Sequence, residues 1–169
     1  KLDEILANSI SRLGPDLLGV LASLNNLAGA LREAGRLGDA IPLYEKVLAD
    51  SARVLGDDHP HTLISRGNLA GAYYAVGRLG DAIPLFEEVL ADRVRVLGDE
   101  HPDTLTSRGN LAYAYREAGR LDEAIPLYEE VLADRMRILG ADHPDTLISR
   151  YNLAHACWEA GRLDEAITL

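Results

Sequence analysis

Apolar side chains recur along the chain at helical spacing, in two alternating kinds of segment. Residues 60–76 represent the first kind, and Leu63, Leu69 and Tyr73 fall on one side of a helix there. No stretch alternates apolar and polar residues as a half-buried strand does. Residues 80–97 represent the second kind, with apolar residues at Ala82, Ile83, Phe86, Val89, Leu90 and Leu97. The pattern therefore predicts an all-α protein.

Proline and glycine mark where these predicted helices begin and end. Pro60 suits a first helical turn, where its missing N–H costs nothing. Gly77 ends the first helix, as glycine does where the chain turns left-handed, and Gly98 ends the second. Pro84 lies inside the second pattern. We expect it in the first turn, among the four N–H groups that have no helical partner, and the same for Pro42 and Pro126.

The helix pair is an internal repeat with a period of 42 residues. Gly35, Gly77, Gly119 and Gly161 recur at this spacing, and residues 57–98 and 99–140 align without a gap. Leu17-Leu18 stand where later copies have His-Pro. The chain therefore divides into a lone second helix at 1–14, a degenerate repeat at 15–56, two full repeats at 57–98 and 99–140, and a truncated repeat at 141–169.

Neither helix of a pair buries its apolar stripe alone, so successive pairs must stack on one another. We expect a right-handed superhelical solenoid of antiparallel helix pairs. First helices should line its concave face, and second helices its convex face. Acidic residues such as Glu87 and Glu88 would then lie on the solvated convex side.

The framework residues resemble the tetratricopeptide repeat signature. They are Asn68-Leu69-Ala70, Ala72-Tyr73, Gly77, Ala82-Ile83, Phe86 and Val89-Leu90. The period is longer than the usual 34 residues and is similar to that of kinesin light chains. It is also similar to arrays that follow nucleotide-binding switch modules in bacterial and fungal signalling proteins. The resemblance implies an interaction scaffold that binds peptides in its concave groove.

The copies differ from one another mainly on the predicted concave face. The column with Asn68 is constant, and an amide satisfies both the N–H and C=O of an extended peptide. A bond between neighbouring helices explains the column equally well. Aromatic and arginine side chains vary in nearby columns, and these types often dominate interface energy. One alternative is that these residues differ by neutral drift at solvent-exposed positions. Another is that the aromatic side chains only cover the end of the helix stack. The candidate peptide-binding residues are Asn26, Asn68, Asn110, Asn152, Arg32, Tyr74, Tyr113, Arg116, Tyr151, His155 and Trp158.

One branch of the family holds chaperone tails with groove lysines. This chain instead has Asn25, Gly67, Gly109 and Tyr151 at those positions, which argues against that ligand. Arg32 and Arg116 are candidates to attract ligand carboxylates, with Glu33 and Glu117 partly cancelling them.

Charge and cysteine content narrow the function classes. The net charge of −10 argues against nucleic acid and anionic membrane surfaces as partners. No apolar run approaches the roughly 20 residues of a membrane helix. The single cysteine, Cys157, excludes an internal disulfide and favours a cytoplasmic location.

Several groups of residues resemble metal-binding or catalytic sites, but a structural role explains each of them. His59, His101 and His143 lie one repeat apart, too far to converge on one metal ion, so we expect them to cap the turns between repeats. We predict neither a metal nor a cofactor, and no enzyme activity, because no catalytic constellation occurs. The three arginines on the buried side of first helices should pair with acids of the preceding second helix: Arg66 with Asp50, Arg108 with Asp92, and Arg150 with Asp134.

The sequence thus predicts a scaffold that binds a protein or peptide segment, as one arm of a larger signalling or adaptor protein. The alternative is a self-assembling structural module, either natural or an engineered, consensus-like array. In that case the uncapped ends would associate head to tail, with Tyr151, Cys157, Trp158 and Ile167 near an open edge.

Overall fold

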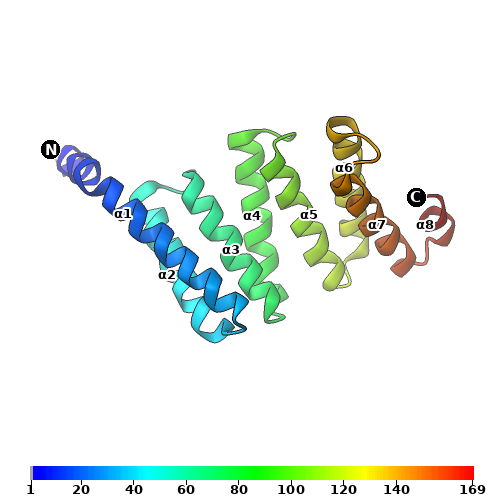
Figure 1. Cartoon of the computed structure of the whole chain (residues 1–169), viewed down its shortest axis with the longest axis horizontal. Coiled ribbons are helices and arrows are strands. Elements are labelled where there is room, and N and C mark those ends of the chain that lie inside the picture. Colours follow the sequence, from blue (N-terminus) through cyan, green and yellow to red (C-terminus); the bar gives the residue numbers. More distant parts are fainter. Residues whose placement is uncertain (1) are drawn as a thin grey trace. The chain divides into compact units, whose positions relative to one another are not determined.

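The computed structural model describes the backbone of residues 2–169 and the side chains of residues 17–169. Regular structure in this part of the chain is entirely helical, which confirms the all-α prediction (Figure 1). The described residues form eight helices: α1 (Leu2–Glu33), α2 (Leu37–Leu55), α3 (Pro60–Ala75), α4 (Leu79–Leu97), α5 (Pro102–Glu117), α6 (Leu121–Leu139), α7 (Pro144–Glu159) and α8 (Leu163–Thr168).

The chain forms two compact units, Lys1–Arg78 and Leu79–Leu169. In the N-terminal unit, α2 packs against both α1 and α3. In the C-terminal unit, α5 packs against α4 and α6, and α7 packs against α6 and α8. Helices that follow one another in sequence are therefore neighbours in space within each unit (Figure 1).

Histidine caps the first helices, as the sequence predicts. His101 has extended backbone angles, and its Nδ1 accepts a hydrogen bond from the N–H of Asp103 at 3.1 Å. His59 and His143 cap α3 and α7 in the same way. Each cap satisfies one of the unpaired N–H groups at a helix start, and the proline that follows needs no partner.

A left-handed glycine ends each first helix. Gly119 has φ +74°, and the N–H of Arg120 donates to the carbonyl of Tyr115 at 2.9 Å. The Gly119 N–H donates to the Arg116 carbonyl at 2.9 Å, so both bonds of a Schellman motif are present. A side chain at position 119 would be strained at this φ, which explains why glycine recurs there.

The second helices begin earlier than the sequence predicts, so the expectation for their prolines is wrong. Because α4 starts at Leu79, Pro84 is its sixth residue rather than one of its first four. Pro42 in α2 and Pro126 in α6 have the same register. The carbonyl that loses its helical partner is four residues earlier, at the exposed Gly38 in α2, where water can replace the bond.

The predicted break between residues 14 and 15 is also absent, because α1 runs continuously from Leu2 to Glu33. The reason is visible in the sequence: Leu17-Leu18 replace the His-Pro pair that caps α3, α5 and α7. Without that cap, nothing starts a new helix. The apolar stripe predicted for residues 1–14 lies outside the side chains that the structure describes. The division of the chain into repeats stays a prediction.

Arg108 pairs with acids, but not with those of the preceding helix. Its side chain is 8% exposed and contacts Asp99 at 3.1 Å, Glu130 at 3.2 Å and Asp134 at 3.2 Å. Glu130 and Asp134 belong to α6, the helix that follows. The prediction that Arg108 pairs with Asp92 of the preceding helix is therefore wrong. The guanidinium extends toward the second helix of its own pair.

A different arginine joins each second helix to the next first helix in the C-terminal unit. Arg93 of α4 donates to the Asp103 carbonyl at 2.9 Å and to Ser107 Oγ at 2.8 Å. Arg135 of α6 makes the same pair of bonds at the start of α7. In the N-terminal unit the equivalent residue is Ser51, which is fully buried with no hydrogen-bond partner for its hydroxyl among the described residues.

Cys157 is a core residue and is not left at an open edge. It is 1% exposed in α7, and burial raises the pKa of its thiol. We expect a thiol reagent such as DTNB to modify the native protein at least about tenfold more slowly than the protein unfolded in guanidinium, because reaction requires local opening. Equal rates in the two states would show that α7 does not bury this face.

Candidate functional site

One face of α5 is free of the core. Thr106, Asn110, Tyr113 and Glu117 are all exposed and follow one another at helical spacing. Buried Leu111 and neighbouring residues occupy the opposite side of the helix. The Asn110 side chain makes no hydrogen bond within the described part of the chain. α5 therefore offers a free amide beside an aromatic ring.

One side of α7 carries three aromatic rings in a row. Tyr151, His155 and Trp158 are spaced i, i+4 and i+7, and so share one side of the helix. The His155 ring lies 6.0 Å from the Tyr151 ring and 5.7 Å from the Trp158 ring. Tyr151 is 66% exposed and Trp158 is 60% exposed. Large aromatic side chains left this exposed are typical of interaction surfaces.

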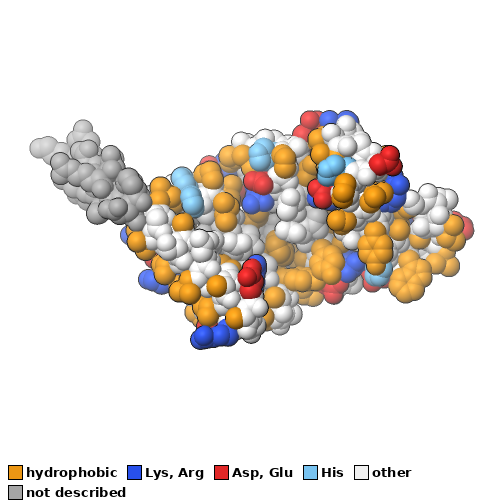
Figure 2. All heavy atoms as spheres, in the orientation of Figure 1, with side chains coloured by type: hydrophobic (Ala, Val, Ile, Leu, Met, Phe, Trp, Pro, Cys, Tyr) orange, Lys and Arg blue, Asp and Glu red, His pale blue; other side chains and the backbone are white. Residues whose placement is uncertain are grey.

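The exposed sides of α5 and α7 form one surface, which we call the α5–α7 face. Its members are Asn110, Tyr113, Tyr151, Asn152, His155 and Trp158. Arg116 joins the two helices beneath it, because its Cζ lies 4.4 Å from the centre of the Tyr113 ring and its Nη1 lies 3.4 Å from His155 Nδ1. Hydrophobic side chains gather over α5 and α7 in the space-filling view (Figure 2). Seven sequence candidates, Arg116 included, therefore come together here.

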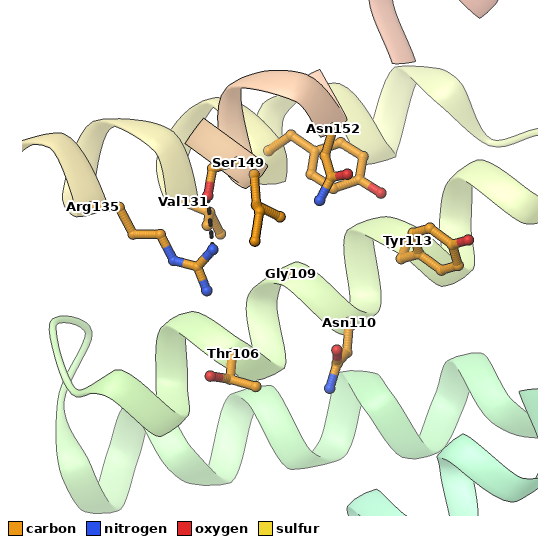
Figure 3. Close-up of a pocket in the computed structure, with 10 residues that line it drawn as sticks. Thr106, Gly109, Asn110, Tyr113, Val131, Arg135, Ser149 and Asn152 are labelled. Carbon is orange, nitrogen blue, oxygen red and sulfur yellow. Dashed lines mark hydrogen bonds between the residues drawn. The ribbon is translucent and has the colours of Figure 1, made fainter. Parts of the chain in front are cut away.

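A pocket of about 200 Å³ opens between α5, α6 and α7 (Figure 3). Asn110 and Asn152 line it from two helices, and Tyr113 lies at one end. Arg135 lies at the other end, held by its hydrogen bond to Ser149. The remaining lining residues are Thr106, Gly109, Tyr128, Val131 and Ile148.

The pocket contains a polar residue that the sequence assigned only to the framework. Tyr128 is 2% exposed, and its hydroxyl has no hydrogen-bond partner among the described residues. Burial raises the pKa of this phenol, so it stays protonated. The equivalent residue in α4 is Phe86, which shows that packing does not require the hydroxyl. That Tyr-to-Phe difference between copies was the available signal.

We expect Tyr128→Phe to raise the free energy of unfolding by about 1 kcal/mol, because a buried hydroxyl without a partner is unfavourable. Tyr115→Phe is the matched control. Its hydroxyl donates to Glu87 at 2.7 Å, so that change should lower stability by about 1 kcal/mol. Urea denaturation measures both. Equal losses would show that the Tyr128 hydroxyl has a partner, such as pocket water.

Arg116 is less available to a ligand carboxylate than the sequence suggested. Its side chain is 10% exposed and pairs with Glu117 at 2.7 Å and with Glu159 at 3.7 Å. The predicted compensation by Glu117 is therefore present, and Glu159 adds to it. The guanidinium supports the Tyr113 ring from below rather than facing solvent.

An equivalent pocket of about 270 Å³ occurs in the N-terminal unit. Asn26, Arg32 and Asn68 line it, and Tyr74 does not. Asn68 Nδ2 donates to Asn25 Oδ1 on α1 at 3.1 Å, so this member of the asparagine column makes the interhelical bond that was one of its two explanations. Among the aromatic residues of the α5–α7 face, Trp158 alone has an aromatic counterpart in this unit, Tyr74, since glycines take the places of the others: Gly29, Gly67 and Gly71.

The described residues contain no group of three or more His, Cys, Asp or Glu that fits a metal ion. Nor is any helix among them both long and apolar enough to cross a membrane.

A family model for the tetratricopeptide repeat matches residues 19–93, 68–135 and 110–169. The chain belongs to the tetratricopeptide repeat family. Members are generally protein–protein interaction modules, and the eight described helices form such a repeat array. A search of curated proteins finds no match.

Solved structures give the same answer for the fold. The repeat array is similar to the nearly identical TPR-like repeats of a kinesin light chain-like protein from Podosopora anserina, at 37% identity and a TM-score of 0.82. That match covers 88% of this chain and 70% of the other. BtubC from P. vanneervenii matches with a TM-score of 0.83 at 22% identity, covering 98% of this chain and 68% of the other, and so supports the fold alone.

Proposed function

We propose that this repeat array binds an extended segment of another protein across the α5–α7 face. The single observation that carries the proposal is the pairing of free amides with exposed aromatics on that face. Asn110 and Asn152 lie on neighbouring helices, and neither side chain is used within the described structure. Each amide has a donor and an acceptor to offer, which suits the backbone of an extended ligand.

The aromatic rings supply the second part of such a site. Tyr113, Tyr151 and Trp158 present apolar area at low conformational cost, since each side chain has only two rotatable angles. The pocket between the asparagines accepts one ligand side chain. Amides would then position the backbone while rings and pocket provide most of the affinity, which is how interface energy is usually distributed. No catalytic step enters this proposal.

The setting we propose is an interaction arm of a larger signalling or adaptor protein in the cytoplasm. The family's general role and the likeness to kinesin light chain-like repeats support the first part. The lone, buried cysteine supports a reducing compartment.

Panning a random peptide library against the protein tests the proposal. Trp158 is the only tryptophan and lies on the face, so its fluorescence reports binding directly. We expect selected peptides to change that fluorescence and to lose affinity when Asn110 and Asn152 are both changed to alanine. Peptides that bind equally well to that double variant would contradict the proposal.

Self-association is the second candidate, and α8 supplies the observation that favours it. Leu163 is 53% exposed and Ile167 is 82% exposed on this helix. Two such apolar side chains would be covered in a head-to-tail contact between copies. Sedimentation tests this candidate: a mass that stays at 18.4 kDa up to several hundred micromolar (about crystallisation concentration) removes it.

A further inference from the structure

The C-terminal unit is far more acidic than the rest of the chain. Residues 79–169 contain 18 Asp and Glu side chains against 9 Arg, a net charge of −9 out of −10 for the whole protein. A partner that approaches this unit therefore meets a negative potential. Positive charge on the partner is favoured before any contact forms.

The α5–α7 face itself exposes carboxylates, whereas its guanidinium, that of Arg116, is largely buried. Glu117 and Glu159 are 40% and 33% exposed, whereas Arg116, which they flank, is 10% exposed. Arg116, Glu117 and Glu159 together carry one positive and two negative charges. A ligand carboxylate beside Arg116 would add to the negative excess and would find that guanidinium already paired with Glu117 and Glu159.

The exposed rings beside these carboxylates are suited to a cation. Trp158 directly precedes Glu159 on α7, and Tyr113 stands four residues before Glu117 on α5. A guanidinium stacks on an aromatic face, with tryptophan the best partner, and it also pairs with a carboxylate in two-point geometry. Arginine does both at once, whereas lysine offers only a compact point charge.

We propose that the α5–α7 face selects a basic segment, and that an arginine of this segment stacks on Trp158 and pairs with Glu159. This inference rests on the proposed function and adds the chemistry of the partner. It reverses the expectation from sequence that Arg116 would attract an acidic ligand. The reversal follows from the burial of Arg116 and from the exposure of the two carboxylates around it.

Calorimetry with matched synthetic peptides tests the inference. One neutral Ala-Ser-Gly scaffold carries arginine, lysine, glutamate or glutamine at the same positions. We expect the arginine peptide to bind at least tenfold more tightly than the glutamate peptide at low salt, with lysine between them. The difference should shrink as salt screens the charges.

Variants locate the effect. Glu159→Gln and Trp158→Ala should each weaken the arginine peptide fivefold or more, and circular dichroism confirms that both fold. Asp122→Asn is the control, because it removes one exposed carboxylate on α6 and should leave affinity within twofold. An equal loss in the control would mean that net charge, and not this face, sets the preference, and that would overturn the inference.

The outcomes also separate this inference from the proposed function. If glutamate or glutamine peptides bind as tightly as the arginine peptide and still depend on Asn110 and Asn152, the basic preference is wrong and the peptide site stands. If no peptide, including those from the library, binds this face, both are wrong.

Discussion

Leu111→Ala should lower the free energy of unfolding by roughly 2–5 kcal/mol, the usual cost of truncating a buried leucine. Leu111 is 4% exposed on the core side of α5, opposite the α5–α7 face. Urea denaturation followed by circular dichroism gives the value. Leu69→Ala in α3 should lower the free energy of unfolding by a similar amount, because Leu69 is also 4% exposed.

Leu147→Ala is the matched control for this prediction. Leu147 lies on α7 and is 48% exposed, so the same chemical change should cost less than about 0.5 kcal/mol. If Leu111→Ala and Leu147→Ala cost the same, the assignment of buried and exposed sides to the first helices would be wrong, and the α5–α7 face would lose its basis.

Trp158→Ala should weaken a bound peptide by more than about 1 kcal/mol, the scale of an interface hot spot. The ring is exposed and contacts His155, so its removal changes the face without opening the core. Tyr113→Ala and Arg116→Ala should weaken binding as well, because Arg116 supports the Tyr113 ring at 4.4 Å. Anisotropy of a labelled peptide measures all three, since Trp158→Ala removes the intrinsic fluorophore.

Met136→Ala and Glu88→Ala test the opposite surface. Met136 is 43% exposed on α6, a second helix, and offers apolar area comparable to a groove residue. Both changes should leave peptide affinity nearly unaffected. Similar losses on the two surfaces would remove the case for a site on the first helices.

The fold was predictable because the residues that begin and end the helices recur in successive repeats. His101 caps α5, Pro102 is its first residue, and Gly119 ends it. The same residue types recur 42 positions later and bound α7. The first copy has Leu17-Leu18 in place of the His-Pro pair. There the predicted boundary between residues 14 and 15 is absent, and α1 continues through it. Local sequence signals thus predicted the helices wherever those signals were present.

The chemistry of the candidate site was less predictable, because it depends on contacts between helices. Variation among copies identified Tyr113, Tyr151 and Trp158 as exposed. The sequence alone did not reveal that Arg116 is buried between Glu117 and Glu159, since those partners come from α5 and α7. Nor did it reveal the unpaired hydroxyl of Tyr128, which lies on α6. Burial and pairing of a polar atom follow from three-dimensional packing.

Photo-crosslinking tests the central claim most directly. A library-selected peptide carrying a diazirine residue is bound, irradiated and digested, and mass spectrometry locates the adducts. We predict adducts on α5 and α7, around Asn110, Tyr113, Asn152 and Trp158. Adducts confined to the outer surface of α4 or α6 would contradict the account.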